Sequence, residues 1–292
     1  MNLTITGYST ALFSTWYFVD ELGLLFDAGD GVAAGLLQKS RKIRQVFISH
    51  ADRDHLTGLH QLNQLNARNG FPVIHFPKDS GSFPAIEAFS KAFDPHVSGT
   101  IWKPVIAGEK TWIRDDMYVE AVRNSHVKAP DDVFKSLGYK VITIKRKIKA
   151  ELALLPPATI KSIIMEQGQE ATTVETFTTI LSYSADTPVE NFDHWNGSET
   201  LIHEATFLGG DDAAHLGAHG NRHSTLDEVL QQVSIIKIGQ LILGHFSSRY
   251  APEQIDAAIQ SGCKKYGIKI PVYRVLPGEK VVDILQQSPV NM

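Results

Sequence analysis

The chain has 292 residues, 43% of them hydrophobic and 21% charged, a balance typical of a soluble globular protein with a large core. The net charge of −4 argues against a globally basic nucleic-acid binder. Cys263 is the only cysteine, which excludes a disulfide framework and a thiolate cluster. We therefore expect a cytoplasmic protein in which histidine and carboxylate groups hold any metal ion. No run approaches the ~20 apolar residues of a membrane span, and Met1 to Val19 resembles strand more than signal peptide.

The N-terminal part predicts three strands in succession. β-Branched and aromatic residues place them at Leu3–Thr6, Trp16–Val19 and Leu24–Phe26. The third strand runs directly into the turn-rich segment Asp27–Gly31, after which Gly31–Leu37 predicts a helix.

The most informative segment follows the next predicted strand, which ends at Val46–Ile48. Residues 50 to 55 read His-Ala-Asp-Arg-Asp-His, and leucines recur at helical spacing from Leu56 to Leu65. A buried carboxylate without a partner is costly, and the usual partner of such a dense cluster is a cation. The segment predicts a metal site on the loop at a strand end; a solvated polar loop is the alternative.

Later strands end in a similar way. Strands are predicted at 117–122, 141–144, 178–183, 200–203 and 241–243, with a helix at about 226–235. His126, Asp186 and His245 each lie just past one of these strands. Any one alone is more typical of a capping or surface residue. Together with the cluster at 50–55 they supply seven nitrogen and oxygen ligands, enough for two metal ions.

The segment Lys145–Gln169 departs from this pattern. It is rich in lysine and alanine and is interrupted by Pro156-Pro157, so it predicts either two short helices or a protruding arm. Its basic residues (Lys145, Arg146, Lys147 and Lys149) could meet phosphates, or could simply form a solvated face.

The motifs together resemble the metallo-β-lactamase superfamily, and within it the short-form ribonuclease Z (tRNase Z) group. The resemblance spans residues 25 to 250. It is carried by the cluster at 50–55 with Asp186 and His245, and by these further strings: Leu25-Phe26-Asp27-Ala28-Gly29-Asp30-Gly31, Ser136-Leu137-Gly138-Tyr139, Tyr183-Ser184-Ala185-Asp186-Thr187, His203-Glu204-Ala205-Thr206-Phe207, His223-Ser224-Thr225 and His245-Phe246-Ser247-Ser248-Arg249-Tyr250.

The resemblance implies a single α/β domain over residues 1–292, a four-layer αββα sandwich in which 145–178 forms either a reduced arm or a helical insertion. It also implies two divalent metal ions, expected to be zinc. The implied ligands are His50, Asp52, His126 and Asp186 for one ion, and Asp54, His55, Asp186 and His245 for the other. Asp27 is expected to support the site from behind.

The implied reaction is endonucleolytic phosphodiester hydrolysis at the 3′ end of precursor tRNA by a homodimer. Asp54 is expected to accept the proton of the attacking water. Glu204 is expected to orient His223, which donates a proton to the departing oxygen, because a carboxylate beside an imidazole fixes its tautomer and raises its pKa. A buried ion pair with no catalytic role is the alternative for Glu204 and His223.

Two departures from the ribonuclease Z pattern keep other functions open. Asp52 stands where the family has histidine, and a carboxylate favours iron or manganese more than imidazole does. The segment Lys145–Thr178 lacks the Gly-Pro signature of the family's tRNA-binding arm, and the expected N-terminal loop, Gly7–Thr15, lacks its glycine and proline pattern. The alternatives are a phosphodiesterase or esterase acting on a small molecule, and a non-catalytic binding protein with a degraded metal site.

Overall fold

Two seven-stranded sheets face each other in the computed structural model, which describes residues 1–94, 99–209 and 222–292. The first sheet has the strand order β14 (Lys280–Val281), β1 (Ile5–Thr10), β2 (Ser14–Val19), β3 (Leu24–Phe26), β4 (Gln45–Phe47), β5 (Val73–Pro77), β6 (Ile101–Val105). The second has the order β13 (Val272–Arg274), β12 (Gln240–Gly244), β11 (Thr200–Glu204), β10 (Thr173–Tyr183), β9 (Leu137–Ile148), β8 (Met117–Arg123), β7 (Lys110–Arg114).

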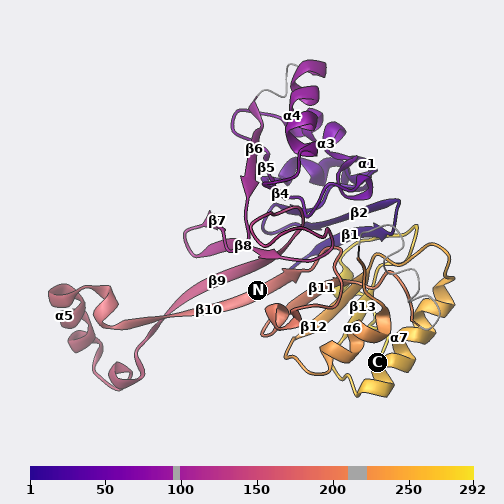
Figure 1. Cartoon of the computed structure of the whole chain (residues 1–292). Helices are drawn as coiled ribbons and strands as arrows, with labels where there is room; N and C mark the ends of the chain where they lie inside the picture. Colours follow the sequence, from indigo (N-terminus) through magenta and orange to yellow (C-terminus); the bar gives the residue numbers. More distant parts are fainter. Residues whose placement is uncertain (95–98, 210–221) are drawn as a thin grey trace.

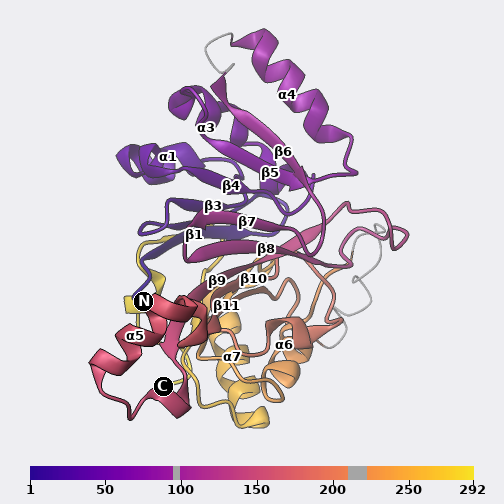
Figure 2. The same ribbon diagram turned by 90° about the vertical axis from the view of Figure 1, so that its left-hand side faces the viewer.

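Helices cover the outer face of each sheet (Figure 2). The first sheet carries α1 (Val32–Leu36), α3 (Leu59–Asn66) and α4 (Ser82–Phe93), and the second carries α6 (Leu226–Val233) and α7 (Pro252–Tyr266). The short α2 (Arg53–Leu56) lies in the loop after β4. The described residues also form five 3-10 turns: η1 (Leu37–Lys42), η3 (Ala150–Leu152), η4 (Gln169–Ala171), η5 (Phe192–Trp195) and η7 (Ile284–Gln286). The four layers are those of the predicted αββα sandwich.

Three apolar cores hold these layers together, because successive strand residues point to opposite faces. In β4, Phe47 packs between the two sheets, whereas its neighbour Val46 packs under the helices of the first sheet. In β12, Ile242 joins the core between the sheets and Leu243 packs under α6 and α7. Strands buried on both faces are nearly continuous apolar runs, which is why the sequence identified them.

Four adjacent strands run parallel in each sheet, β3 to β6 in the first and β10 to β13 in the second. Loops that follow parallel strands emerge at one edge of a sheet, where functional side chains can meet. Most of the predicted ligands follow β4, β10 or β12. The topology therefore places them at the edge of each sheet where the parallel strands end.

The segment 145–178 forms a protruding arm. β9 and β10 pair antiparallel from Tyr139 opposite Tyr183 out to Ile148 opposite Thr173, and the ribbon extends away from the sandwich with α5 (Pro157–Gln167) at its tip (Figure 1). The arm therefore combines an extension of two sheet strands with η3, α5 and η4 between them, where the sequence predicted either two short helices or a protruding arm. Its basic residue Arg146 pairs with Glu175 across the ribbon at 3.2 Å.

Three local expectations differ from the structure. Leu3 and Thr4 precede the first strand, which begins at Ile5. The leucine series belongs to two helices, α2 and α3, and Leu65 is exposed. The expected loop 7–15 is largely a β1–β2 hairpin. Among the described residues, no helix is both long and apolar enough to cross a membrane.

Candidate metal centre

The predicted ligands converge on the edge where the loops of both sheets meet. Asp27 follows β3, the 50–55 cluster follows β4, and His126, Asp186 and His245 come after β8, β10 and β12. Six of the seven predicted ligands follow a strand that has a parallel neighbour (β4, β10 or β12), and His126 follows the antiparallel strand β8. The structure thus brings together residues up to about two hundred positions apart, as in the pair His245 and Asp54, 191 residues apart.

One group of four ligand candidates is buried and compact. Ligand atoms of Asp54, His55, Asp186 and His245 all lie within 4.8 Å of one another. Asp186 Oδ2 is 3.2 Å from Nε2 of both His55 and His245, and Asp54 Oδ2 is 3.3 Å from His245 Nε2. Two carboxylates and two imidazoles at these separations form a donor set suited to one divalent ion.

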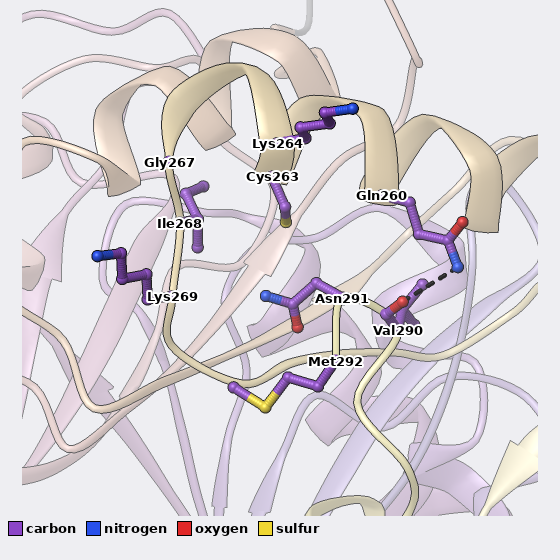
Figure 3. Close-up of a pocket in the computed structure, with 9 residues that line it drawn as sticks. All are labelled: Gln260, Cys263, Lys264, Gly267, Ile268, Lys269, Val290, Asn291 and Met292. Atoms are coloured by element: carbon purple, nitrogen blue, oxygen red, sulfur yellow. Dashed lines mark hydrogen bonds between the residues drawn. The ribbon is translucent and has the colours of Figure 1, made fainter.

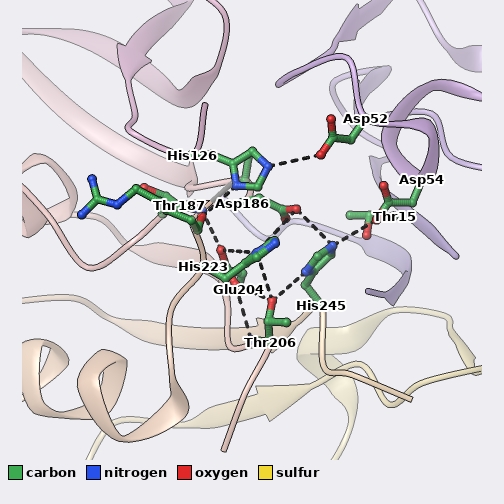
Figure 4. A network of polar contacts seen from close by, with 12 residues as sticks. Thr15, Asp52, Asp54, His126, Asp186, Thr187, Glu204, Thr206, His223 and His245 are labelled. Atoms are coloured by element: carbon green, nitrogen blue, oxygen red, sulfur yellow. Dashed lines mark hydrogen bonds and ion pairs between the residues drawn. The ribbon is translucent and has the colours of Figure 1, made fainter. Parts of the chain in front are cut away.

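A second group lies beside the first. His50, Asp52 and His126 have ligand atoms within 4.8 Å of one another. Asp52 Oδ2 is 3.4 Å from His126 Nε2, the contact drawn in Figure 4, and 3.6 Å from His50 Nε2. Asp186 Oδ2 lies 3.8 Å from His50 Nε2 and so stands between the two groups. Asp52 therefore faces the cluster, although its side chain is 43% exposed.

The four histidines are all oriented for metal binding through Nε2. Each Nδ1 has a hydrogen-bond partner within the protein: Ser49 Oγ for His50 (2.9 Å), Asp27 Oδ2 for His55 (2.7 Å), Arg222 O for His126 (2.8 Å) and Thr206 Oγ1 for His245 (2.8 Å). Partners of this kind fix the tautomer of metal-ligating histidines. Nε2 of His50 and of His55 is buried without a hydrogen-bond partner. A buried imidazole nitrogen that has no hydrogen-bond partner is free to bind a metal ion.

Asp27 lies behind the ligand candidates, where it contacts His55; this is the position that the resemblance implies for it. Its fully buried carboxylate accepts hydrogen bonds from Ser49 N (2.7 Å), Ser49 Oγ (2.8 Å), Tyr183 OH (2.5 Å) and His55 Nδ1. Because Ser49 Oγ donates to Asp27, it is left to accept from His50 Nδ1. A single carboxylate thus orients one histidine of each group.

The charges of the site reinforce one another. Hydrogen bonds from His126 and His50 hold the pKa of Asp52 well below its usual range. Burial alone would raise the pKa of Asp54 and Asp186, but neighbouring histidines outweigh it and lower both. Burial likewise would lower the pKa of His55, yet the charge of Asp186, followed by those of Asp27 and Asp54, raises it. The carboxylates are therefore ionised at neutral pH and available as ligands.

Glu204 and His223 form the predicted pair beside this cluster. His223 Nδ1 donates to Glu204 Oε1 at 3.1 Å, and Glu204 is buried while the His223 side chain is 20% exposed. Burial would lower the pKa of His223, but the charge and hydrogen bond of Glu204 raise it to about 9. At neutral pH the His223 ring is therefore protonated on both nitrogens, the form that a general acid needs. Its partial exposure leaves it within reach of a substrate.

Thr206 joins this pair to the ligand cluster (Figure 4). Its hydroxyl donates to Glu204 Oε2 at 2.5 Å and accepts from His245 Nδ1 at 2.8 Å. Thr187 N also donates to Glu204, at 2.6 Å. The carboxylate is therefore held from three directions, and its position is tied to that of a ligand candidate.

Sharp backbone turns place these side chains. Asp27, Ala185 and His245 each follow a strand closely and adopt φ values of 55°, 55° and 59°, in the left-handed region that non-glycine residues rarely occupy. At Gly29, a Cβ atom would collide with the backbone of Asp54. The glycine of the predicted turn therefore allows close contact between the loops that carry Asp27 and Asp54.

The sequence indicates the ligand candidates, but it does not indicate which groups hydrogen-bond to them or to Asp27. Tyr183 and Thr206 lie inside the strings that carry the resemblance, and Ser49 directly precedes the cluster at 50–55, but nothing in their spacing shows which distant side chain each contacts. Leu12 is a further omission: in the β1–β2 hairpin, its backbone N donates to Asp54 Oδ2 at 3.0 Å. No residue type at position 12 would have signalled that contact, because it comes from the main chain.

Two sizeable cavities in the described part of the chain lie away from this cluster. One of about 440 Å³ lies between the end of α7 and the C-terminal residues (Figure 3). Burial raises the pKa of its Cys263 thiol to about 11, so the thiol is protonated at neutral pH and is a poor nucleophile. By contrast, the pocket behind the ligands, lined by Tyr17, Tyr183 and Asp186 among others, has a volume of about 10 Å³.

Comparison with known proteins agrees with this architecture. No family model matches the chain. Chloroplastic tRNase Z TRZ2 of Arabidopsis thaliana is 28% identical over 285 residues, which cover 92% of this chain and 74% of that protein. Ribonuclease Z of Bacillus licheniformis is 27% identical, covering 79% of this chain and 80% of its own length.

Solved structures share the fold. The metallo-β-lactamase fold protein YhfI from Bacillus subtilis matches with a TM-score of 0.63 and 15% identity, covering 96% of this chain and 100% of its own. The short form of human tRNase Z matches with a TM-score of 0.59 and 18% identity, covering 85% of this chain and 93% of its own. The chain therefore has the metallo-β-lactamase fold, and its recognised relatives in sequence are ribonucleases Z.

Proposed function

We propose that this protein is a metal-dependent phosphodiesterase of ribonuclease Z type, which cleaves precursor tRNA endonucleolytically at its 3′ end. One observation carries the proposal. Two groups of ligand candidates, with Asp186 common to both, lie next to a separate proton-donor pair, Glu204 and His223. Ribonuclease Z sequences that align with most of the chain support RNA as the substrate.

The ligand groups would hold two divalent ions. His50, Asp52, His126 and Asp186 would hold one, and Asp54, His55, Asp186 and His245 the other. Divalent ions at such a centre supply Lewis acidity, which neutralises charge on phosphate oxygens and makes water a stronger nucleophile near neutral pH. Four of the seven ligands are imidazoles, a donor set suited to zinc, whereas the carboxylate of Asp52 favours iron or manganese at its group.

The remaining steps belong to side chains of this chain. Asp54 is ionised and lies within the ligand cluster, so its carboxylate can take the proton of the attacking water. Glu204 Oε1 holds Nδ1 of His223 at 3.1 Å, which leaves Nε2 to donate a proton to the departing 3′ oxygen. Thr206 and Thr187 keep Glu204 in place, so the donor is positioned before substrate binds.

Three further features of the proposal have different support. A cytoplasmic location is in keeping with the single cysteine, whose buried thiol stays reduced in that compartment. Zinc as the resident metal rests on the imidazole-rich donor set. Assembly as a homodimer rests on the family resemblance alone.

The experiment that tests the function is cleavage of a precursor tRNA with a 3′ trailer, mapped to single-nucleotide resolution. The metal-loaded protein should release one trailer fragment from a single position, and EDTA should abolish the cut. Asp54→Asn should also abolish it, while Lys264→Gln, on the surface remote from the cluster, should cut like wild type. Hydrolysis of bis-nitrophenyl phosphate without cleavage of precursor tRNA would instead assign the protein to small phosphodiesters.

A further inference from the structure

A second cavity, of about 660 Å³, lies at the opposite end of the first sheet from the ligand cluster. It is formed by the β2–β3 turn, the start of β4, the segment before β5 and the end of β7, and is lined by Asp20, Glu21, Leu22, Gly23, Arg41, Lys42, Arg44, Gln45, Arg68, Phe71, Ile113 and Arg114. Gly23, which lines the cavity, and Asp27, which lies behind the ligand cluster, flank the three-residue strand β3 and are roughly 13 Å apart at ~3.3 Å per residue.

Positive charge is concentrated in this cavity. Its lining contains five cationic side chains and two carboxylates, an excess of three positive charges in a chain whose net charge is −4. The two carboxylates already have partners. Asp20 pairs with Lys42 at 2.6 Å and with Lys39 at 3.2 Å, and Glu21 Oε2 accepts from Thr4 N at 2.9 Å.

Three guanidinium groups of the lining have no carboxylate partner. Within residues 1–94, 99–209 and 222–292, Arg41, Arg44 and Arg68 form no ion pair within 4.0 Å, and all three are exposed. Arginine forks match the geometry of phosphate oxygens and bind them through paired hydrogen bonds. Arg41 and Arg44 line the concavity from the segment before β4 and Arg68 lines it from the segment before β5, an arrangement that can contact more than one phosphate oxygen.

An aromatic surface accompanies the charges. The Phe71 ring is 37% exposed, and the Arg68 guanidinium lies 5.0 Å from its centroid. Exposed aromatic rings beside arginines are surfaces on which nucleic-acid bases stack. The cavity is also within the size range of small-ligand sites.

We propose that this basic cavity is a binding site for nucleotide phosphates, with Arg41, Arg44 and Arg68 holding phosphate oxygens and Phe71 contacting the base. The nucleotide could be free or could be part of an RNA chain, because both present the same groups. The site does not depend on the proposed hydrolysis, since it shares no residue with the ligand cluster.

Binding to the intact, metal-loaded protein tests the proposal in two arms. The first measures α,β-methylene-ADP by calorimetry, because its P–C–P bridge resists hydrolysis. The second measures a fluorescein-labelled tRNA by anisotropy over a range of salt concentrations. Both use the variant Arg44→Gln/Arg68→Gln and a matched control, Lys264→Gln/Lys269→Gln, which removes two exposed positive charges from the cavity of Figure 3.

The arginine variant should weaken binding of at least one probe about tenfold or more, while the control stays within about twofold of wild type. Arg44→Lys/Arg68→Lys should lose part of the affinity, because it keeps the charge without the fork.

Loss confined to the nucleotide identifies a free ligand, and loss of tRNA binding with a shallower salt dependence identifies an RNA backbone. Equal affinities for wild type and arginine variant, or an equal loss in the control, would overturn the proposal. Precursor tRNA cleavage assayed in parallel reports separately on the proposed function.

Discussion

At the scale of single residues, Thr206 links a ligand candidate to the Glu204–His223 pair. Its hydroxyl accepts from His245 and donates to Glu204, so it orients a metal ligand and the carboxylate behind the proton donor at once. Valine has the same shape without the hydroxyl, and it would leave His245 Nδ1 and Glu204 Oε2 each short of one partner.

Thr206→Val should therefore lower the affinity for metal by about 10–100-fold, the usual effect of losing an outer-shell partner. Thr206→Ser, which keeps the hydroxyl, should stay near wild type. Competition against a chromogenic chelator measures the affinity without any need for activity. Equal affinities for the valine and serine variants would show that the hydroxyl does not orient His245.

Asp52 sets the metal preference if it is a ligand, as its contacts with His50 and His126 suggest. Imidazole is a softer donor than carboxylate, so Asp52→His should raise zinc affinity relative to manganese. The ratio of the two dissociation constants, measured for both proteins by the same competition, gives the answer. An unchanged ratio would mean that Asp52 only neutralises its histidine neighbours.

Glu204 and His223 should act as a unit in proton donation. Glu204→Gln and His223→Asn should each lower kcat by about 10²–10⁴-fold on RNA, and the double variant should be little worse than either single one. Both losses should shrink on bis-nitrophenyl phosphate, because nitrophenolate departs without a proton. Losses of the same size on both substrates would reduce the pair to a structural ion pair.

At the scale of elements, strand ends explain why the ligands could be predicted. A central strand buried on both faces is an apolar run, so a histidine or aspartate directly after it is conspicuous; His50, Asp186 and His245 were found in this way. Tyr183 was not, although its hydroxyl meets Asp27, 156 residues away. Which strand lies opposite which is set by sheet packing, and no local pattern of residues encodes it.

Strand extent was predicted less well for the same reason. β9 and β10 continue well past their apolar parts into the arm, where exposed residues such as Lys147 and Val174 face each other across the ribbon. Pairing between two distant strands maintains this structure, whereas the sequence of each strand alone resembles a polar loop. The arm's helix α5 contains no buried residue.

The arm can be removed at a defined point. Lys149 N donates to Thr172 O at 3.0 Å, so residues 150–171 can be replaced by Gly-Gly while the ribbon stays paired. Cleavage of precursor tRNA should then fall through a higher KM, with hydrolysis of bis-nitrophenyl phosphate and the melting temperature nearly unchanged. Equal KM values for precursor tRNA with and without the arm would exclude a role in RNA binding.

At the scale of the whole molecule, the candidate metal centre joins the two halves of the sandwich. The first sheet supplies the ligands from the 50–55 cluster, and the second supplies His126, Asp186 and His245. Neither sheet alone brings together a full set of donors, so the centre exists only when the two sheets pack. This arrangement explains why short strings scattered along the sequence can together indicate one site. The packed core of the two sheets fixes the relative positions of these strings.

The metal content of the purified protein tests the central claim most directly. After reconstitution with zinc at neutral pH and removal of free metal, elemental analysis should give two ions per chain. Anomalous scattering from crystals should place one ion among His50, Asp52, His126 and Asp186, and the other among Asp54, His55, Asp186 and His245. A protein that retains no metal, or that binds it elsewhere, would contradict the account.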